Sequence, residues 1–184
     1  MNHLGTRRLE TDRLALRRFV GGDAPAMYAN WASDDEVTRY LTWPTHPSVD
    51  ATAAYLEQVV ASYGDPAVYQ WGIELKATGE LIGNISAVRC EDAIGMFELG
   101  WVLGRRWWGR GIMTEAAGEV VRFFFEEVGA NRVCAGHDVN NPRSGRVMEK
   151  VGMRFEGCLR GAGRNNCGIV DVNLWAILRQ DRRP

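Results

Sequence analysis

The sequence has few of the features that mark secreted, metal-dependent or membrane-spanning proteins. Its four cysteines include no pair at CxxC spacing, and no histidine cluster accompanies them, which disfavours a zinc site. The N-terminal segment MNHLGTRRLETDRL has no apolar core of signal-peptide length, and no stretch reaches the roughly 18 apolar residues of a membrane span. We therefore expect a cytoplasmic protein with reduced thiols and no metal.

A strong net charge is also missing, and so are the common phosphate-binding motifs. The net charge of −1 offers no general electrostatic reason to bind nucleic acid or anionic membrane. No GxxxxGK[ST] occurs, and Thr114 stands where a dinucleotide fingerprint needs its third glycine after Gly111. The length of 184 residues predicts a single domain, residues 1–184, with a proper core.

What is present is a regular succession of strand and helix patterns. Alternating or short apolar runs predict strands, and apolar residues at helical spacing predict helices. The expected strands are 13–19, 69–75, 80–88, 96–103, 132–139, 154–161 and 170–178. The expected helices are one after Asp23, one opened by Ser48 or Asp50, and those at 112–128 and 142–151. The segments 39–48 and 160–168 are expected to be irregular.

This order predicts the fold class. The strand–helix–strand unit 96–139 implies a parallel pair, whereas the preceding meander should be antiparallel. We expect an α/β (α+β) domain with a mixed, mostly antiparallel sheet of about seven strands, a central parallel pair and about four flanking helices.

The turn before the helix at 112–128 is the first candidate site. Gly109-Arg110-Gly111 follows a strand and opens a helix, where free N–H groups and a flexible backbone suit a phosphate. Arg105 and Arg106 add positive charge. The alternative is that the glycines serve turn geometry alone. Glu115 lies opposite the apolar stripe of this helix, which favours a solvated or helix-start carboxylate over a catalytic one.

The second candidate site is the strand end and helix start in VNNPRSGRVMEKVGMRFEG, residues 139–157. Asn141 and Ser144 can direct an amide and a hydroxyl into one cleft. The alternative readings are a helix N-cap for Asn141 and a surface hydroxyl for Ser144.

Two further stretches, LGWVLGRRWWGRGIMTEA and the opening LETDRLALRRF, join this segment in a recognisable pattern. On these residues the chain resembles the GNAT superfamily of acetyl-CoA-dependent N-acetyltransferases. The resemblance is strongest to its RimJ/RimL-like branch, which acetylates ribosomal-protein N-termini. The resemblance implies that the glycine turn binds the pyrophosphate of coenzyme A, in the register that aligns Trp108, Gly111 and Met113 with the family's pattern. The implied cofactor-binding residues are Val102, Leu103, Trp108, Gly109, Arg110, Gly111, Ile112, Met113 and Asn141.

The resemblance also bears on catalysis. Many family members carry a tyrosine as general acid where this chain has Met148, so Ser144 is the implied partner of the departing sulfur. Glu98 is the only charge in its strand and is the expected base, directly or through water, unless it is a paired structural carboxylate. His137 is the rival base, with a packed core histidine as its alternative. No cysteine has the surroundings of a nucleophile, which favours direct transfer.

The predicted function is transfer of an acetyl group from acetyl-CoA to a primary amine, in particular a protein or peptide N-terminal α-amine. The alternatives are a small-molecule amine acetyltransferase, a non-catalytic CoA-binding sensor of the same fold, and an enzyme that uses a larger acyl donor. Trp43, His46 and Arg160 are possible acceptor contacts. We expect a monomer or homodimer with no nucleic-acid or membrane partner.

Overall fold

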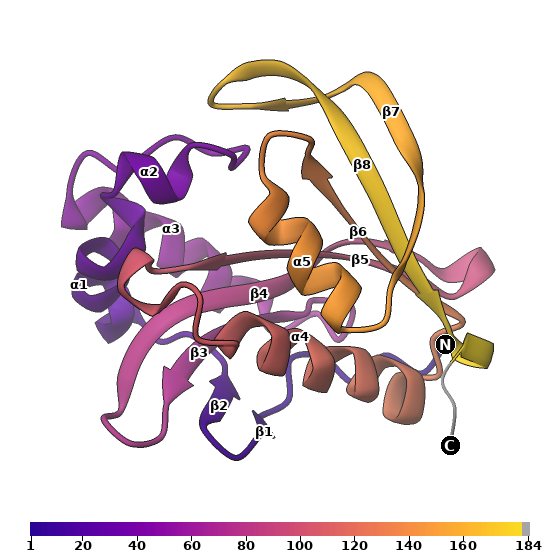
Figure 1. Cartoon of the computed structure of the whole chain (residues 1–184). Helices are drawn as coiled ribbons and strands as arrows, with labels where there is room; N and C mark the ends of the chain where they lie inside the picture. Colours follow the sequence, from indigo (N-terminus) through magenta and orange to yellow (C-terminus); the bar gives the residue numbers. More distant parts are fainter. Residues whose placement is uncertain (182–184) are drawn as a thin grey trace.

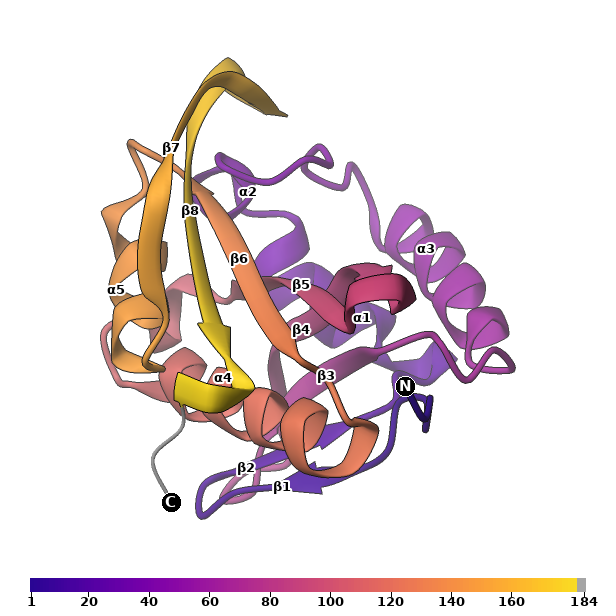
Figure 2. The same ribbon diagram turned by 90° about the vertical axis from the view of Figure 1, so that its right-hand side faces the viewer.

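The computed structural model describes residues 1–181, which form one mixed sheet with helices on both faces (Figures 1 and 2). The strands lie in the order β1-β2-β3-β4-β5-β6-β8-β7, and only the pair β5–β6 is parallel. In these residues the strands are β1 (Leu9–Glu10), β2 (Leu14–Arg17), β3 (Gln70–Leu75), β4 (Glu80–Glu91), β5 (Met96–Leu103), β6 (Arg132–Asp138), β7 (Arg154–Asn165) and β8 (Gly168–Leu178).

Two of the helices begin at signals that the sequence contains, whereas the expected cap residue Asp23 makes no side-chain capping hydrogen bond at the start of its helix. The Ser48 hydroxyl accepts a hydrogen bond from the Ala51 N–H at 3.2 Å, and Pro142 is the first residue of its helix. Within residues 1–181, no helix is both long and apolar enough to cross a membrane. The described α-helices are α1 (Ala24–Met27), α2 (Asp35–Thr38), α3 (Val49–Ser62), α4 (Ile112–Phe123) and α5 (Pro142–Lys150).

The predicted fold class is confirmed, and two short elements add to the expected seven strands and four helices. Strand β1 pairs with β2 over only two residues. Helix α2 has four residues, and the side chain of Asp34 caps its first turn by accepting a hydrogen bond from the Glu36 N–H. Elements this short contain less than one or two periods of any apolar pattern, so the sequence gives no periodic signal for them.

One expected loop was wrong. Residues 160–168 are not irregular, because β7 continues to Asn165 and only Asn166 and Cys167 join it to β8. The glycines of this segment accompany a shift in strand register between Leu159 and Gly163, which is typical of a β-bulge. The result is a long hairpin that extends beyond the body of the sheet (Figures 1 and 2).

Two hydrophobic cores occupy the two faces of the sheet. The larger core packs α4 and part of α5 against one face, and the smaller core packs α1 and α3 against the other. Alternation along β5 divides its side chains between them, since Phe97 and Leu99 enter the larger core whereas Val102 enters the smaller. The predicted buried stripe of the helix at 112–128 is confirmed, and its members are Met113, Ala117, Val120, Val121, Phe124 and Val128.

Candidate active site

The central feature of the candidate site is a gap between β5 and β6. Their parallel pairing ends at the pair Leu99–Ala135, although β5 continues to Leu103 and β6 to Asp138. Strand β6 is paired with β8 over its whole length instead. The carboxyl ends of β5 and β6 therefore separate, and the backbone edge of β5 beyond Leu99 has no β6 partner.

A cleft of about 680 Å³ lies at these strand ends. Its walls come from the segment around α2, the end of β5, the turn before α4, the first turn of α4 and the exposed side of α5. The lining residues are Glu36, Val37, Arg39, Tyr40, Leu41, Trp101, Val102, Leu103, Trp107, Trp108, Gly109, Gly111, Ile112, Met113, Thr114, Asn140, Asn141, Pro142, Arg143, Ser144, Arg146, Val147 and Lys150.

The glycine turn forms one wall of this cleft. Gly109 and Gly111 have φ of +75° and +74°, in the left-handed region that favours glycine, and Gly111 is the N-cap of α4. A Cβ on Gly109 would meet no atom within 4 Å, so the turn is open on that side. The first N–H groups of α4, including those of Ile112 and Met113, have no partner within the helix. This wall can therefore donate several hydrogen bonds to an anionic group.

Trp108 ties the turn to the end of β5. Its indole Nε1–H donates to the carbonyl oxygen of Leu103 at 2.7 Å. On the cleft side, the Arg143 guanidinium lies 4.7 Å from the centre of the Trp108 ring, a cation–π contact with α5. Trp108 thus connects the strand, the glycine turn and α5 around the cleft.

Most of the positive charge of the cleft comes from three basic side chains of α5, which were not among the predicted site residues. Arg143, Arg146 and Lys150 line the cleft at spacings of three and four residues. That spacing places them on one face of a helix, and it is the signal that could have identified them. Together with Arg39 they give the cleft four cationic side chains, against the single carboxylate of Glu36 among the described lining residues. The cleft therefore favours an anionic ligand.

The arginines of the turn itself point to other partners. Arg105 forms an ion pair with Asp34 at 3.0 Å, and Arg106 lies 3.7 Å from Glu80. Arg110, a predicted cofactor contact, is exposed and is not among the lining residues, while its carbonyl oxygen accepts a hydrogen bond from Arg13 Nη1. The ion pair of Arg105 instead anchors the N-cap residue of α2, which holds the α2 wall against the turn.

Glu115 stabilises the outer side of the same turn. It accepts hydrogen bonds from Thr11 and from Arg13, which connect the β1–β2 turn to the first turn of α4. Partial burial alone would raise the pKa of Glu115, but these hydrogen bonds bring the pKa below its ordinary value. The carboxylate therefore stays ionised beside a helix N-terminus, in agreement with the structural interpretation of this residue.

The start of α5 forms the opposite wall. Asn141 occupies the N-cap position but makes no side-chain capping hydrogen bond, so its amide is available to the cleft that it lines. Ser144 is half-buried and lines the same cleft one turn later. Met148, in contrast, is 1% exposed and belongs to the larger core. The structure thus brings Asn141 and Ser144 to the glycine turn and keeps Met148 out of the cleft.

The two predicted bases differ in their surroundings. Glu98 is not a lining residue; it pairs with Cys134 on β6 immediately before the strands separate, and its Oε2 lies 3.8 Å from Arg89 Nε. His137 is buried, its Nδ1 lies 2.7 Å from the carbonyl oxygen of Asp138, and its Nε2 accepts a hydrogen bond from Trp175 Nε1 at 3.2 Å. With both ring nitrogens bonded, His137 has the environment of a packed core histidine.

The tip of the β7–β8 hairpin contacts the segment around α2. The Asn166 amide donates to the carbonyl oxygens of Thr38 and Trp43, at 2.9 and 2.8 Å. Trp43 and His46, two possible acceptor contacts, have ring centres 5.2 Å apart and tilted ring planes, but they do not line the cleft. Burial lowers the pKa of His46. Tyr40 and Leu41, from the same segment, do line it.

The cleft combines three features: a separated parallel strand pair, a glycine turn rich in free N–H groups, and a cationic helix. Together they suit an extended anionic ligand bound at the edge of the sheet. Comparison with known proteins identifies the class. The family model described as an acetyltransferase (GNAT) domain matches residues 13–154. The chain therefore belongs to the GNAT acetyltransferase family, and it is an acetyl-CoA-dependent N-acetyltransferase.

Individual relatives agree with this assignment. The chain is 33% identical over 171 residues to an uncharacterized N-acetyltransferase, YoaA, of Bacillus subtilis (strain 168), covering 93% of this chain and 96% of that protein. It is 34% identical over 97 residues to a ribosomal-protein-serine acetyltransferase of Escherichia coli (strain K12), covering 53% and 54% of the two chains. The crystal structure of a GNAT-family acetyltransferase from Bacillus anthracis superposes with a TM-score of 0.83 at 25% identity, covering 95% and 99%.

Proposed function

We propose that the enzyme acetylates the N-terminal α-amine of a protein or peptide, which attacks the thioester of acetyl-CoA directly. The observation that carries this proposal is the scarcity of bases at the cleft. Among the described lining residues, only the exposed Glu36 is a carboxylate, and His137 is bonded at both ring nitrogens. An acceptor that supplies its own neutral amine suits such a site best.

The pKa values of the two common protein amines explain why this favours an α-amine. An α-amine has an ordinary pKa of about 8, whereas a lysine side chain has about 10.4. At pH 7 about one α-amine in ten is therefore neutral, against fewer than about one lysine in a thousand. Similarity to a ribosomal-protein-serine acetyltransferase supports the same acceptor class.

In this proposal the coenzyme A moiety of the donor occupies the cleft. The pyrophosphate lies against the N–H groups from Gly109 to Met113, and the basic face of α5 neutralises the remaining phosphate charge. The open backbone edge of β5 near Val102 and Leu103 binds the amide-containing arm, with Asn141 opposite. A backbone N–H at this end of β5 stabilises the oxyanion that forms when the amine attacks.

The proton and the sulfur then need partners. We assign Glu98, at the base of the strand gap, to take the ammonium proton. Because Glu98 lies about 13 Å along β5 from Val102 and outside the lining residues, the proton travels along a chain of several waters. Ser144 donates a hydrogen bond to the departing thiolate, in place of the phenolic acid that Met148 excludes. The C–N bond forms when the amine attacks, and the C–S bond breaks when the oxyanion intermediate collapses. The proton taken up by Glu98 returns through water to the thiolate, so that coenzyme A leaves as the thiol.

An acceptor screen tests the proposal. The full chain is incubated with acetyl-CoA and a matched panel of short peptides, each with a free or blocked α-amine and with or without a lysine. Amino acids, polyamines and aminoglycosides complete the panel. Thiol release gives the rate, and mass spectrometry locates the acetyl group. A variant of the glycine turn, Gly111→Val, controls for transfer that does not depend on the cleft.

We expect acetylation of free α-amines, with blocked-terminus lysine peptides at least tenfold slower. If a small amine is turned over faster than the peptides, the proposed peptide acceptor is wrong, whereas the acetyltransferase assignment still holds. Acetyl-CoA binding without turnover of any amine would favour the sensor alternative. Faster transfer from a longer acyl-CoA would favour the larger acyl donor.

A further inference from the structure

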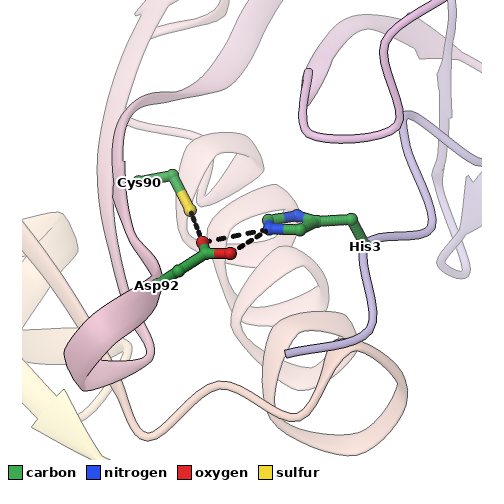
Figure 3. A group of neighbouring side chains, drawn as sticks. All are labelled: His3, Cys90 and Asp92. Atoms are coloured by element: carbon green, nitrogen blue, oxygen red, sulfur yellow. Dashed lines mark hydrogen bonds and ion pairs between the residues drawn. The ribbon is translucent and has the colours of Figure 1, made fainter.

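Three side chains of different metal-ligand types converge outside the cleft (Figure 3). His3 Nε2 lies 3.0 Å from Asp92 Oδ1, and Cys90 Sγ lies 3.2 Å from the same oxygen. One ligand atom from each residue lies within 4.8 Å of the other two. The cluster joins the N-terminal segment, the end of β4 and the helical turn Asp92–Ile94 that leads into β5.

The imidazole of this cluster is held by its surroundings. His3 Nδ1 lies 3.1 Å from the hydroxyl of the buried Tyr69, which also accepts a hydrogen bond from the Leu4 N–H. The His3 ring packs edge-on against Phe97, with ring centres 6.1 Å apart. These contacts leave Nε2 directed at the Asp92 carboxylate. A second partner that fixes the far nitrogen is typical of metal-binding histidines.

A nucleophilic role for this cluster does not fit its geometry. Asp92 lies between Cys90 and His3, so the two observed hydrogen bonds run from thiol to carboxylate and from imidazole to carboxylate (Figure 3). The imidazole therefore does not accept the thiol proton.

We propose that His3, Cys90 and Asp92 bind a zinc ion, with a fourth position open to water. Ligand atoms of a tetrahedral zinc site lie roughly 3.3–3.8 Å apart. The two spacings to Asp92, 3.0 and 3.2 Å, are close to this range, and the ligand atoms of His3 and Cys90 lie within 4.8 Å of each other. Binding replaces the Sγ–H bond of Cys90 by an Sγ–Zn bond, and the proton goes to solvent. CxxC spacing could not indicate this site, because its ligands come from segments far apart in the sequence.

The position of the cluster makes its role structural. It lies at the start of β5, whereas the cleft lies at the end of that strand, about 20 Å away along the chain direction. A bound ion would fasten the N-terminal segment to the β4–β5 connection. We therefore expect zinc to raise thermal stability while leaving acetyl-CoA affinity unchanged.

The test uses the full chain without a histidine tag. Cobalt(II) titration should give a thiolate-to-metal charge-transfer band in the near ultraviolet, and calorimetry gives the zinc affinity. We expect Cys90→Ser to abolish the band and His3→Gln to lower zinc affinity at least tenfold. Tyr69→Phe, which leaves the ligands in place, should lower it about 10- to 100-fold. Cys158 is an exposed thiol on β7, and Cys158→Ser is the matched control. It should leave the cobalt band and the zinc affinity unchanged.

Acetyl-CoA affinity serves as the folding check for every variant, because the cleft is remote from the cluster. A cobalt band that persists in Cys90→Ser, or disappears in Cys158→Ser, would refute the site. Equal zinc affinity of the native chain and a folded His3→Gln variant would refute it as well.

Discussion

Replacing Gly111 by valine tests whether the glycine turn binds the cofactor through its backbone. Gly111 has φ of +74° and ψ of 2°, and a Cβ there would meet only Arg13 Nη2 at 3.7 Å, an ordinary contact. The substitution therefore creates no clash in the free protein. Its cost comes from the left-handed backbone, about 1–2 kcal/mol for a residue with a side chain. For a chain of this size that corresponds to a fall in Tm of roughly 2–8 °C.

The effect on acetyl-CoA should be larger than the effect on folding. If the strained turn relaxes, its N–H groups no longer point at the pyrophosphate. A hydrogen bond to a charged group contributes about 1.5–3 kcal/mol, so the loss of one weakens binding by about tenfold to more than 100-fold. Titration calorimetry measures the affinity, and circular dichroism with thermal melting measures the fold. Gly111→Asn should lose less, because asparagine tolerates this backbone conformation better.

Gly129 offers a matched control at the other end of the same helical segment. Its φ is +88°, and the nearest atom to a Cβ built there is Arg179 Nη2 at 4.0 Å. Gly129→Val should therefore show a comparable loss of Tm with unchanged acetyl-CoA affinity. Native affinity in a folded Gly111→Val variant would show that the turn serves geometry alone. Equal losses of affinity in both variants would assign the effect to general destabilisation.

Three further substitutions address the chemistry and the core. Glu98→Gln should lower kcat about 100-fold or more with little change in acetyl-CoA affinity, and near-native turnover across a pH series would assign proton removal to solvent or to another group. Ser144→Ala should lower kcat about 10- to 100-fold while the dissociation constant of acetyl-CoA stays the same. If kcat is unchanged when the chemical step limits the rate, Ser144 has no part in catalysis and is a hydroxyl on the helix surface. Met148→Ala should cost about 2–5 kcal/mol of unfolding free energy in denaturant titration, because the side chain is 1% exposed, and a loss below about 1 kcal/mol would contradict its core role.

Local signals in the sequence predicted much of this fold. The strand 96–103 and the start of the helix at Ile112 are found where expected, because apolar periodicity and a glycine turn both mark them. The glycine turn and the start of α5 were also recognised as parts of one site, and the cleft brings them together. These features depend on residues close together in the sequence, so the sequence alone is enough to predict them.

Other features depend on residues that are distant in the sequence. The basic face of α5 was missed because Arg143, Arg146 and Lys150 look like ordinary solvated charges until a cleft is seen beside them. The loop expected at 160–168 proved to be strand up to Asn165, with a register shift between Leu159 and Gly163, because its pairing partner lies across the hairpin. The interaction of Asn166 with Thr38 likewise joins segments more than a hundred residues apart.

The gap between β5 and β6 is the feature that connects this fold to its chemistry. A continuous parallel pair would satisfy the backbone groups of both strands, and the sheet would then have no free edge at its centre. Here β6 pairs with β8 along its whole length and leaves β5 after Leu99, where the edge opens into the cleft. The cost of those unpaired groups is offset when a ligand with its own amides occupies the gap. Because the same strand continues into the glycine turn, one short segment, Leu99 to Met113, can hold both the amide arm and the pyrophosphate of one donor molecule.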